Sequence, residues 1–96
     1  MKIRTLIMAI AASVACTSVQ AACYADYKAK KDNPLRLHYG VIELPDGVCA
    51  DPAKAEQQIN QRINGAGWVL LNVLGTFGKD GLGEREESAG EYFLRF

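Results

Sequence analysis

The sequence has 96 residues, of which 49% are hydrophobic and 23% are charged, and its formal net charge is zero. A chain of this length can form one small domain, and it lacks the large basic excess that is typical of nucleic-acid-binding proteins. One basic cluster, Lys28, Lys30 and Lys31, is flanked by Asp26 and Asp32. This mixture indicates a solvated face rather than a patch that binds phosphate groups.

The first 22 residues have the pattern of a secretory signal peptide. Lys2 and Arg4 form a basic start, an apolar stretch of about ten residues follows, and small residues precede a cleavage site after Ala21 or Ala22. The apolar stretch is too short for a membrane-spanning helix, which needs roughly 20 residues. We therefore expect a bacterial protein that is exported to the periplasm or secreted and has no transmembrane anchor in its mature form. After cleavage, nine basic and eleven acidic residues remain, a net charge of −2.

The cysteines indicate a disulfide bond. Cys16 leaves with the signal peptide, so Cys23 and Cys49 remain, an even number in a small exported protein. A bridge between them would stabilise the fold by about 3–4 kcal/mol. In an alternative interpretation, lipid is attached at Cys23 or Cys16 and the protein is an envelope accessory. The residues three positions earlier, Gln20 and Ser13, lack the apolar side chain that is usual there.

The first part of the mature chain is predicted to contain one strand. Residues 23–34 mix small and charged side chains, which are compatible with a short helical turn over residues 24–31, and Asn33-Pro34 predicts a turn. Residues 35–44 alternate in polarity and include β-branched and aromatic side chains, which predicts a strand. Residues 45–47, Pro-Asp-Gly, predict a tight turn after it.

An amphipathic helix is predicted for residues 51–64. Asp51 suits the N-cap, Pro52 suits the first helical position, and Gly65 suits the end of the helix. One narrow apolar stripe runs along it, formed by Ala55, Ile59 and Ile63.

The last third of the chain is predicted to form a hairpin. Residues 68–74 are nearly all apolar and follow a glycine, which indicates a buried strand. Residues 75–90 contain five glycines and a charged run, which predict a long, mobile, solvated loop. Residues 91–96 alternate in polarity and are expected to pair as a strand with residues 68–74.

These elements predict a small α+β fold of order β-α-β-β, with a three-stranded sheet, one amphipathic helix on one face and a disulfide brace. The first two strands would be parallel and the third antiparallel, in an order that the sequence leaves open. The expected organisation is a signal peptide at 1–22, an N-terminal extension at 23–36 tied by the disulfide, and the α+β domain at 37–96.

The motif Gly67-Trp68-Val69-Leu70, between an amphipathic helix and an aromatic C-terminal segment, resembles a group of small uncharacterised bacterial domains of unknown function. Those domains share a strand–helix–(G-W-x-L) strand–strand core, and the likeness covers residues 37–96. The resemblance implies the fold but no activity, because the group has no catalytic residues to transfer. In structural terms, the glycine would end the helix turn and the tryptophan would anchor the helix on the sheet.

The leading functional hypothesis is a non-enzymatic binding or assembly module. A sheet with one helix leaves an apolar face, and large exposed apolar patches usually mark interfaces. This face would bind a protein partner or a second copy through the face itself or through an edge strand. The alternative is that residues 23–36 cover it within the monomer. The candidate interface residues are Trp68, Leu70, Leu74, Tyr92, Leu94 and Phe96.

A second hypothesis is a small hydrolase or thiol enzyme that uses His38 with Cys49, Asp26 or Glu43. So small a domain rarely encloses a ligand pocket of the usual size, so we expect no catalytic site. A single histidine and a paired set of cysteines do not suggest a metal site, and no glycine-rich phosphate loop opens a helix. We therefore expect no cofactor, no metal and no nucleic-acid partner.

Overall fold

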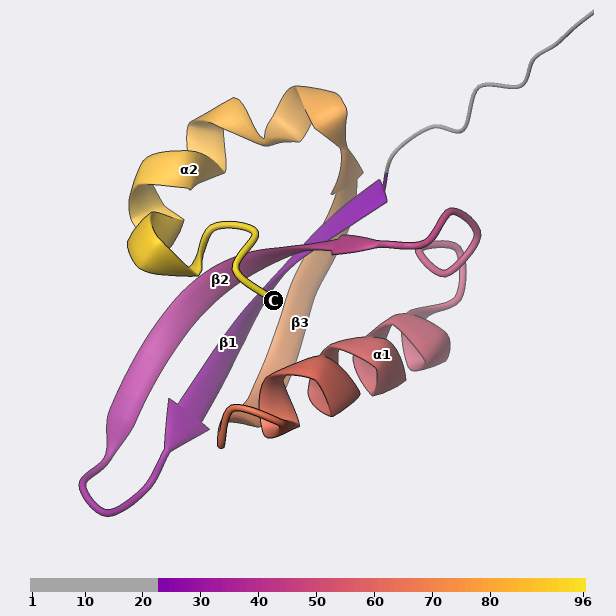
Figure 1. Ribbon diagram of the computed structural model, residues 1–96. Helices are drawn as coiled ribbons and strands as arrows, with labels where there is room; N and C mark the ends of the chain where they lie inside the picture. Colours follow the sequence, from indigo (N-terminus) through magenta and orange to yellow (C-terminus); the bar gives the residue numbers. More distant parts are fainter. Residues whose placement is uncertain (1–22) are drawn as a thin grey trace, which may run out of the picture.

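The computed structural model describes residues 23–96, so the predicted signal peptide lies outside the described residues (Figure 1). Within them, three strands form one sheet, which lies between α1 on one side and α2 on the other. The elements in chain order are β1 (Cys23–Lys31), β2 (Arg36–Leu44), α1 (Pro52–Asn64), β3 (Val69–Gly78), a 3-10 turn η2 (Lys79–Gly81), α2 (Gly83–Ala89) and a 3-10 turn η3 (Gly90–Tyr92).

β1 is the central strand, and the sheet order is β2-β1-β3. It pairs antiparallel with β2 along its whole length, from Cys23 opposite Leu44 to Lys31 opposite Arg36. It also pairs antiparallel with β3, from Cys23 opposite Gly78 to Lys30 opposite Val69. β2 and β3 therefore run in the same direction on either side of β1 without pairing with each other.

Local sequence explains why α1 forms where it does. The Asp51 side chain accepts hydrogen bonds from the backbone N–H groups of Ala53 and Lys54 and so satisfies two donors of the first turn. Pro52 stands at the start of the helix, where its missing N–H costs nothing. The predicted stripe is confirmed, because the buried residues of α1 are Ala55, Ile59 and Ile63.

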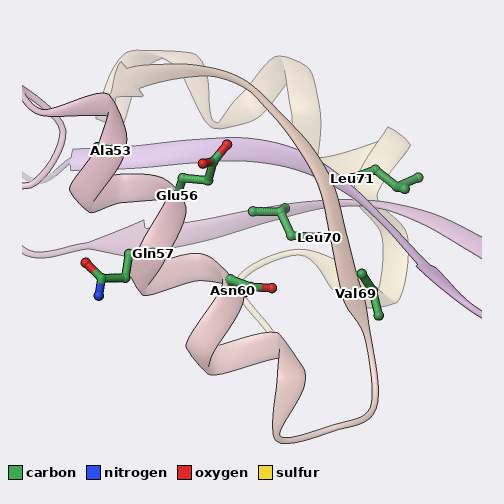
Figure 2. Close-up of a pocket in the computed structure, with 7 residues that line it drawn as sticks. All are labelled: Ala53, Glu56, Gln57, Asn60, Val69, Leu70 and Leu71. Carbon is green, nitrogen blue, oxygen red and sulfur yellow. The ribbon is translucent and has the colours of Figure 1, made fainter.

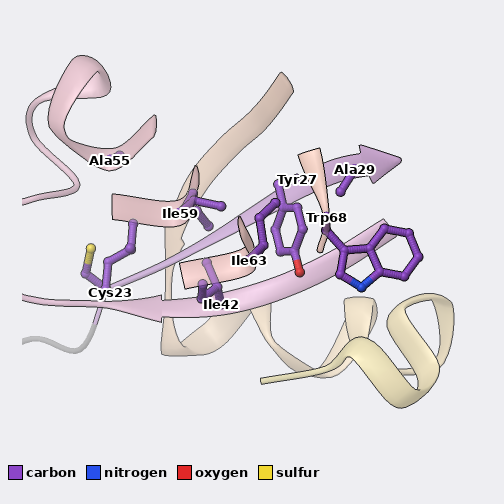
Figure 3. Close-up of a cluster of buried hydrophobic side chains, with 10 residues drawn as sticks. Cys23, Tyr27, Ala29, Ile42, Ala55, Ile59, Ile63 and Trp68 are labelled. Atoms are coloured by element: carbon purple, nitrogen blue, oxygen red, sulfur yellow. The ribbon is translucent and has the colours of Figure 1, made fainter. Parts of the chain in front are cut away.

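The core lies between α1 and the face of the sheet that we call the inner face (Figure 3). Tyr27, Ile42, Ile59 and Ile63 are fully buried there, and each large apolar side chain contributes about 1.5–3 kcal/mol by leaving water. Trp68 lies at one end of this core, which is the structural role of the tryptophan in the Gly-Trp motif. Its backbone N–H bonds to the carbonyl of Ile63, while Gly67 adopts a φ of 89° that ends the helix turn.

A disulfide joins Cys23, the first residue of β1, to Cys49 in the loop before α1, with the two Cα atoms 6.3 Å apart. The predicted bridge is thus confirmed, and it fastens the central strand to the start of the helix. It also uses the sulfur of Cys23 that a lipid would need. Cys16, the other proposed lipidation position, lies outside the described residues.

The opposite side of the sheet, which we call the outer face, is covered only in part. Arg85 of α2 donates a hydrogen bond to the Asp26 carboxylate at 3.1 Å and lies over the Phe77 ring. The hydroxyl of Tyr39 donates a second bond to Asp26 at 2.9 Å. These contacts hold α2 over the half of the outer face near Cys23, where Val41 is 1% exposed.

The predicted α+β class, the three-stranded sheet, the helix on one face and the disulfide are confirmed. The strands expected at residues 35–44 and 68–74 are present as β2 and β3, but the third strand is not the one expected. Residues 23–31 form the central strand instead of a helical turn in an extension, so the chain order is β-β-α-β rather than β-α-β-β. The two strands expected to be parallel, β2 and β3, do run in the same direction, but β1 rather than a C-terminal strand lies between them as the antiparallel third strand. Residues 23–31 are thus part of the sheet, and residues 32–35 form the turn that leads into β2.

The C-terminal predictions also need correction. Residues 75–90 are not a solvated loop, because β3 continues to Gly78 and α2 follows. Residues 91–96 are not a strand of a hairpin. They continue from η3 and touch the sheet through one parallel bridge between Phe93 and Val41, at the outer edge of β2. Leu94 follows with a φ of 57°, which a regular strand does not allow.

Candidate binding surface

The half of the outer face beyond α2, toward the β1–β2 turn, is bare. Pairing places Leu37 of β2, Lys30 of β1 and Val69 of β3 in one row across the sheet. The next row holds Tyr39, Lys28 and Asn72. We call this surface the hairpin face and define it by Lys28, Lys30, Leu37, Tyr39, Val69 and Leu71, with Leu35 beside it in the turn.

The apolar side chains of the hairpin face are unusually open to solvent. Leu35 and Leu37 are 64% and 65% exposed, and Val69 and Leu71 are 47% and 50% exposed. A shallow hollow of about 250 Å³ lies between Lys28, Leu37, Tyr39 and Leu71. Single exposed apolar residues are ordinary, but several on one face indicate a surface that becomes covered.

Irregular pairing contributes to this exposure. The register between β1 and β3 shifts twice, between Asp26 and Tyr27 and between Lys28 and Ala29. Leu74 and Leu71 are the extra residues of β3 at these two bulges, and each is about half exposed. The strand that was predicted to be buried is therefore an edge strand with much of its apolar surface in solvent. Only its inner-face residues, such as Leu70 and Val73, pack against the core.

A second depression runs between α1 and β3. Figure 2 shows Leu70 pointing toward the helix, opposite Glu56, while Leu71 points away from it. The groove has a volume of about 390 Å³, and its helix side consists of Ala53 and the polar residues Glu56, Gln57 and Asn60. β3 borders it as an edge strand, a position that could accept one more strand.

His38 lies on the inner face, inside an aromatic cluster at the end of the core. Its ring stacks on Tyr92 with centroids 3.8 Å apart and meets the edge of Trp68 at 4.3 Å. A hydrogen bond of 3.0 Å joins its Nε2 to the Tyr27 hydroxyl, while its Nδ1 is buried without a partner. Burial lowers the pKa of His38 to about 4, and nearby Glu91 opposes this shift only in part. Burial also raises the pKa of Tyr27 to about 12.

The structure does not bring the proposed catalytic partners to His38. Cys49 is bonded to Cys23 and so offers no free thiolate. Asp26 and Glu43 lie on the outer face, because they pair across the sheet with Val41 and Tyr24. His38 is instead a neutral ring packed among aromatic side chains.

The candidate interface residues separate into three groups. Trp68, Tyr92 and Phe96 gather around His38, and Trp68 is only 4% exposed. Leu70 packs against the core. Leu74 and Leu94 are 47% and 40% exposed, on β3 and on the C-terminal segment.

Sequence reasoning missed Leu35, Leu37 and the lysines of β1 as neighbours on one face. The pattern that could have revealed them is the period-two alternation of Cys23, Ala25, Tyr27 and Ala29, which identifies residues 23–31 as a strand.

Comparisons with known proteins found no matching family model, no matching curated protein and no matching solved structure. The resemblance to small G-W-x-L domains therefore stays a prediction. Among residues 23–96, no group of three or more histidine, cysteine or acidic residues is arranged to hold a metal ion. No helix in the same part of the chain has the length and apolar character needed to cross a bilayer.

Proposed function

We propose that this protein is an exported, non-enzymatic binding or assembly module, located in the periplasm or secreted, and that the hairpin face is its binding surface. The observation that carries the proposal is the exposure of Leu35, Leu37, Val69 and Leu71 at the same end of the sheet, near the β1–β2 turn. The expectation that residues 23–36 cover an apolar face has no support, since residues 23–31 lie within the sheet.

Export is supported by two independent features. The first 22 residues have the composition of a signal peptide. The disulfide between Cys23 and Cys49 is compatible with an oxidising compartment, where such bonds persist.

Site-specific photo-crosslinking in the exporting cell tests the binding surface. A benzophenone amino acid at Leu71, in the hairpin face, should form a defined adduct on irradiation, whether with protein or lipid. The same group at Glu87, exposed on α2, is the matched control and should form none. Intact mass spectrometry identifies the adduct. Equal labelling at both positions, or none at Leu71, would contradict the proposal.

A further inference from the structure

The hairpin face is cationic as well as apolar. Four of the nine basic residues within 23–96 lie between residues 28 and 36, against one acidic residue there, Asp32. Lys30 pairs with Asp32 at 3.2 Å, whereas Lys28 makes no ion pair within residues 23–96. The other two cations of this stretch, Lys31 and Arg36, lie over the Trp68 ring on the inner side of the same hairpin.

The carboxylates of the molecule are concentrated elsewhere. Asp26 precedes the lysines in sequence, but Arg85 and Tyr39 both bind it, so its charge is compensated under α2. The acidic residues that follow β3 begin at the end of the sheet away from the turn, since Gly78 pairs with Cys23. They are Asp80, Glu84, Glu86, Glu87 and Glu91, of which Glu91 lies near His38 and pairs with Arg95 at 3.6 Å.

This distribution argues against a second copy as the occupant of the hairpin face. Two identical faces related by a two-fold axis would bring Lys28 and Lys30 of both copies together, and like charges repel across such a contact. An anionic lipid surface satisfies both features of the face. Apolar side chains enter the boundary between headgroups and acyl chains, while lysines stay at the level of the phosphates.

We propose that the hairpin face docks on the surface of a bilayer that contains anionic lipids, with the β1–β2 turn leading. This inference depends on the proposed function, that this face is a binding surface, and it names the partner. Figure 1 shows the turn projecting past both helices, so Leu35 and Leu37 can reach a flat surface before α2 does. The acidic residues of α2 then remain on the side away from the lipid phosphates.

Flotation of the purified, disulfide-bonded protein with vesicles tests this directly. The protein should float with vesicles of phosphatidylcholine that contain about 30 mol% phosphatidylglycerol, and roughly tenfold less with phosphatidylcholine alone. Raising the salt to about 0.5 M should weaken binding to the anionic vesicles, because surface attraction is screened.

Two double variants separate the charged and apolar contributions. Lys28→Gln with Lys30→Gln should lower the partition coefficient roughly tenfold or more. Leu35→Asn with Leu37→Asn should have an effect of about the same size, since it removes the apolar groups that insert. The matched control is Leu94→Asn, which removes an exposed leucine outside the hairpin face at a φ of 57° that asparagine tolerates. It should change binding by less than about twofold. Unchanged Trp68 fluorescence in each variant verifies the fold.

The outcomes are distinct. Failure of the wild-type protein to bind the anionic vesicles, or equal binding by all variants, overturns the lipid proposal. If crosslinking at Leu71 then yields a protein adduct, the proposed function stands with a protein partner in place of the membrane. If neither vesicles nor an adduct is found, both proposals fail.

Discussion

The His38 side chain is a polar group enclosed by aromatic rings. Its Nε2 shares a hydrogen bond with the Tyr27 hydroxyl, but its buried Nδ1 has no partner in either tautomer. Adding a proton to such a ring would bury a charge, so the pKa of His38 falls to about 4. At neutral pH the ring thus contributes buried packing area, whereas in acid its protonation destabilises the fold.

We therefore expect the protein to lose stability as pH falls from the ordinary histidine pKa of 6.5 toward 4. Across this window the unfolded chain binds the proton and the folded chain does not, so protons favour unfolding. The free energy of unfolding should fall by about 2 kcal/mol between about pH 7 and pH 5. His38→Phe keeps the stacking on Tyr92 and should remove this slope. Urea titrations followed by Trp68 fluorescence measure both proteins, and equal slopes would contradict the assignment.

Gly40 is required by the position of the Tyr27 ring. A Cβ at Gly40 would lie 2.5 Å from the Tyr27 hydroxyl oxygen and 2.6 Å from the ring carbon that bears it. The ring is fully buried and cannot retreat without disturbing its bond to His38. Absence of a side chain at this strand position is what lets the tyrosine cross the sheet to the histidine.

Gly40→Ala should accordingly destabilise the fold by about 1–3 kcal/mol, because an added methyl group overfills a packed core. Gly78→Ala is the matched control, since a Cβ there meets nothing within 4 Å. Thermal unfolding of the two variants compares them directly. If Gly40→Ala is as stable as Gly78→Ala, the tight contact with Tyr27 is not a constraint.

At the scale of elements, the disulfide joins the first strand to the loop that leads into α1. The bridged residues are 26 positions apart, so the bond restricts a long loop of the unfolded chain. Replacing both Cys23 and Cys49 by serine should lower the free energy of unfolding by about 3–4 kcal/mol. Denaturant titrations of the double variant and the oxidised protein give the difference. A loss below about 1 kcal/mol would contradict this stabilising role of the disulfide.

Elements whose sequence signals act within a few residues could be predicted from the sequence. Elements whose position depends on residues far away in the chain could not. The Asp51 cap, the Pro52 start and the isoleucine stripe define α1, and these features act within a few residues. β1 was not predicted as a strand because its inner residues are mostly small. Ala25 and Ala29 are nevertheless fully buried in the core, and this strand with few large apolar residues is the centre of the sheet.

The C-terminal segment was predicted to be a strand, but it does not form one. Residues 91–96 alternate like a strand, but the alternation comes from Tyr92 and Phe96 stacking near His38. The candidate site was affected in the same way. The sequence identified the apolar run of β3 and its need for cover, but the neighbours on the hairpin face follow from the position of β1 between β2 and β3.

At the scale of the whole molecule, charge and apolar surface are distributed along the sheet. The β1–β2 turn carries exposed leucines and an excess of cations, and the opposite end leads into the acidic residues around α2. A body with this distribution is oriented by a negatively charged plane, which attracts one end and repels the other. Such orientation would happen before any apolar group is inserted.

If the protein docks with the β1–β2 turn leading, the turn enters the lipid and α2 stays in water. If the sheet lies flat on the membrane, both approach the lipid. A tryptophan introduced at Leu35 should enter the acyl region and be quenched by brominated lipids in anionic vesicles. A tryptophan at Ser88, exposed on α2, should remain in water and keep its fluorescence. Trp68 is 4% exposed within the core and gives a constant background to both variants. Equal quenching at positions 35 and 88 would indicate a flat orientation, in which the carboxylates of α2 also approach the lipid phosphates. Because that arrangement opposes the charge distribution of the molecule, we expect quenching at residue 35 alone.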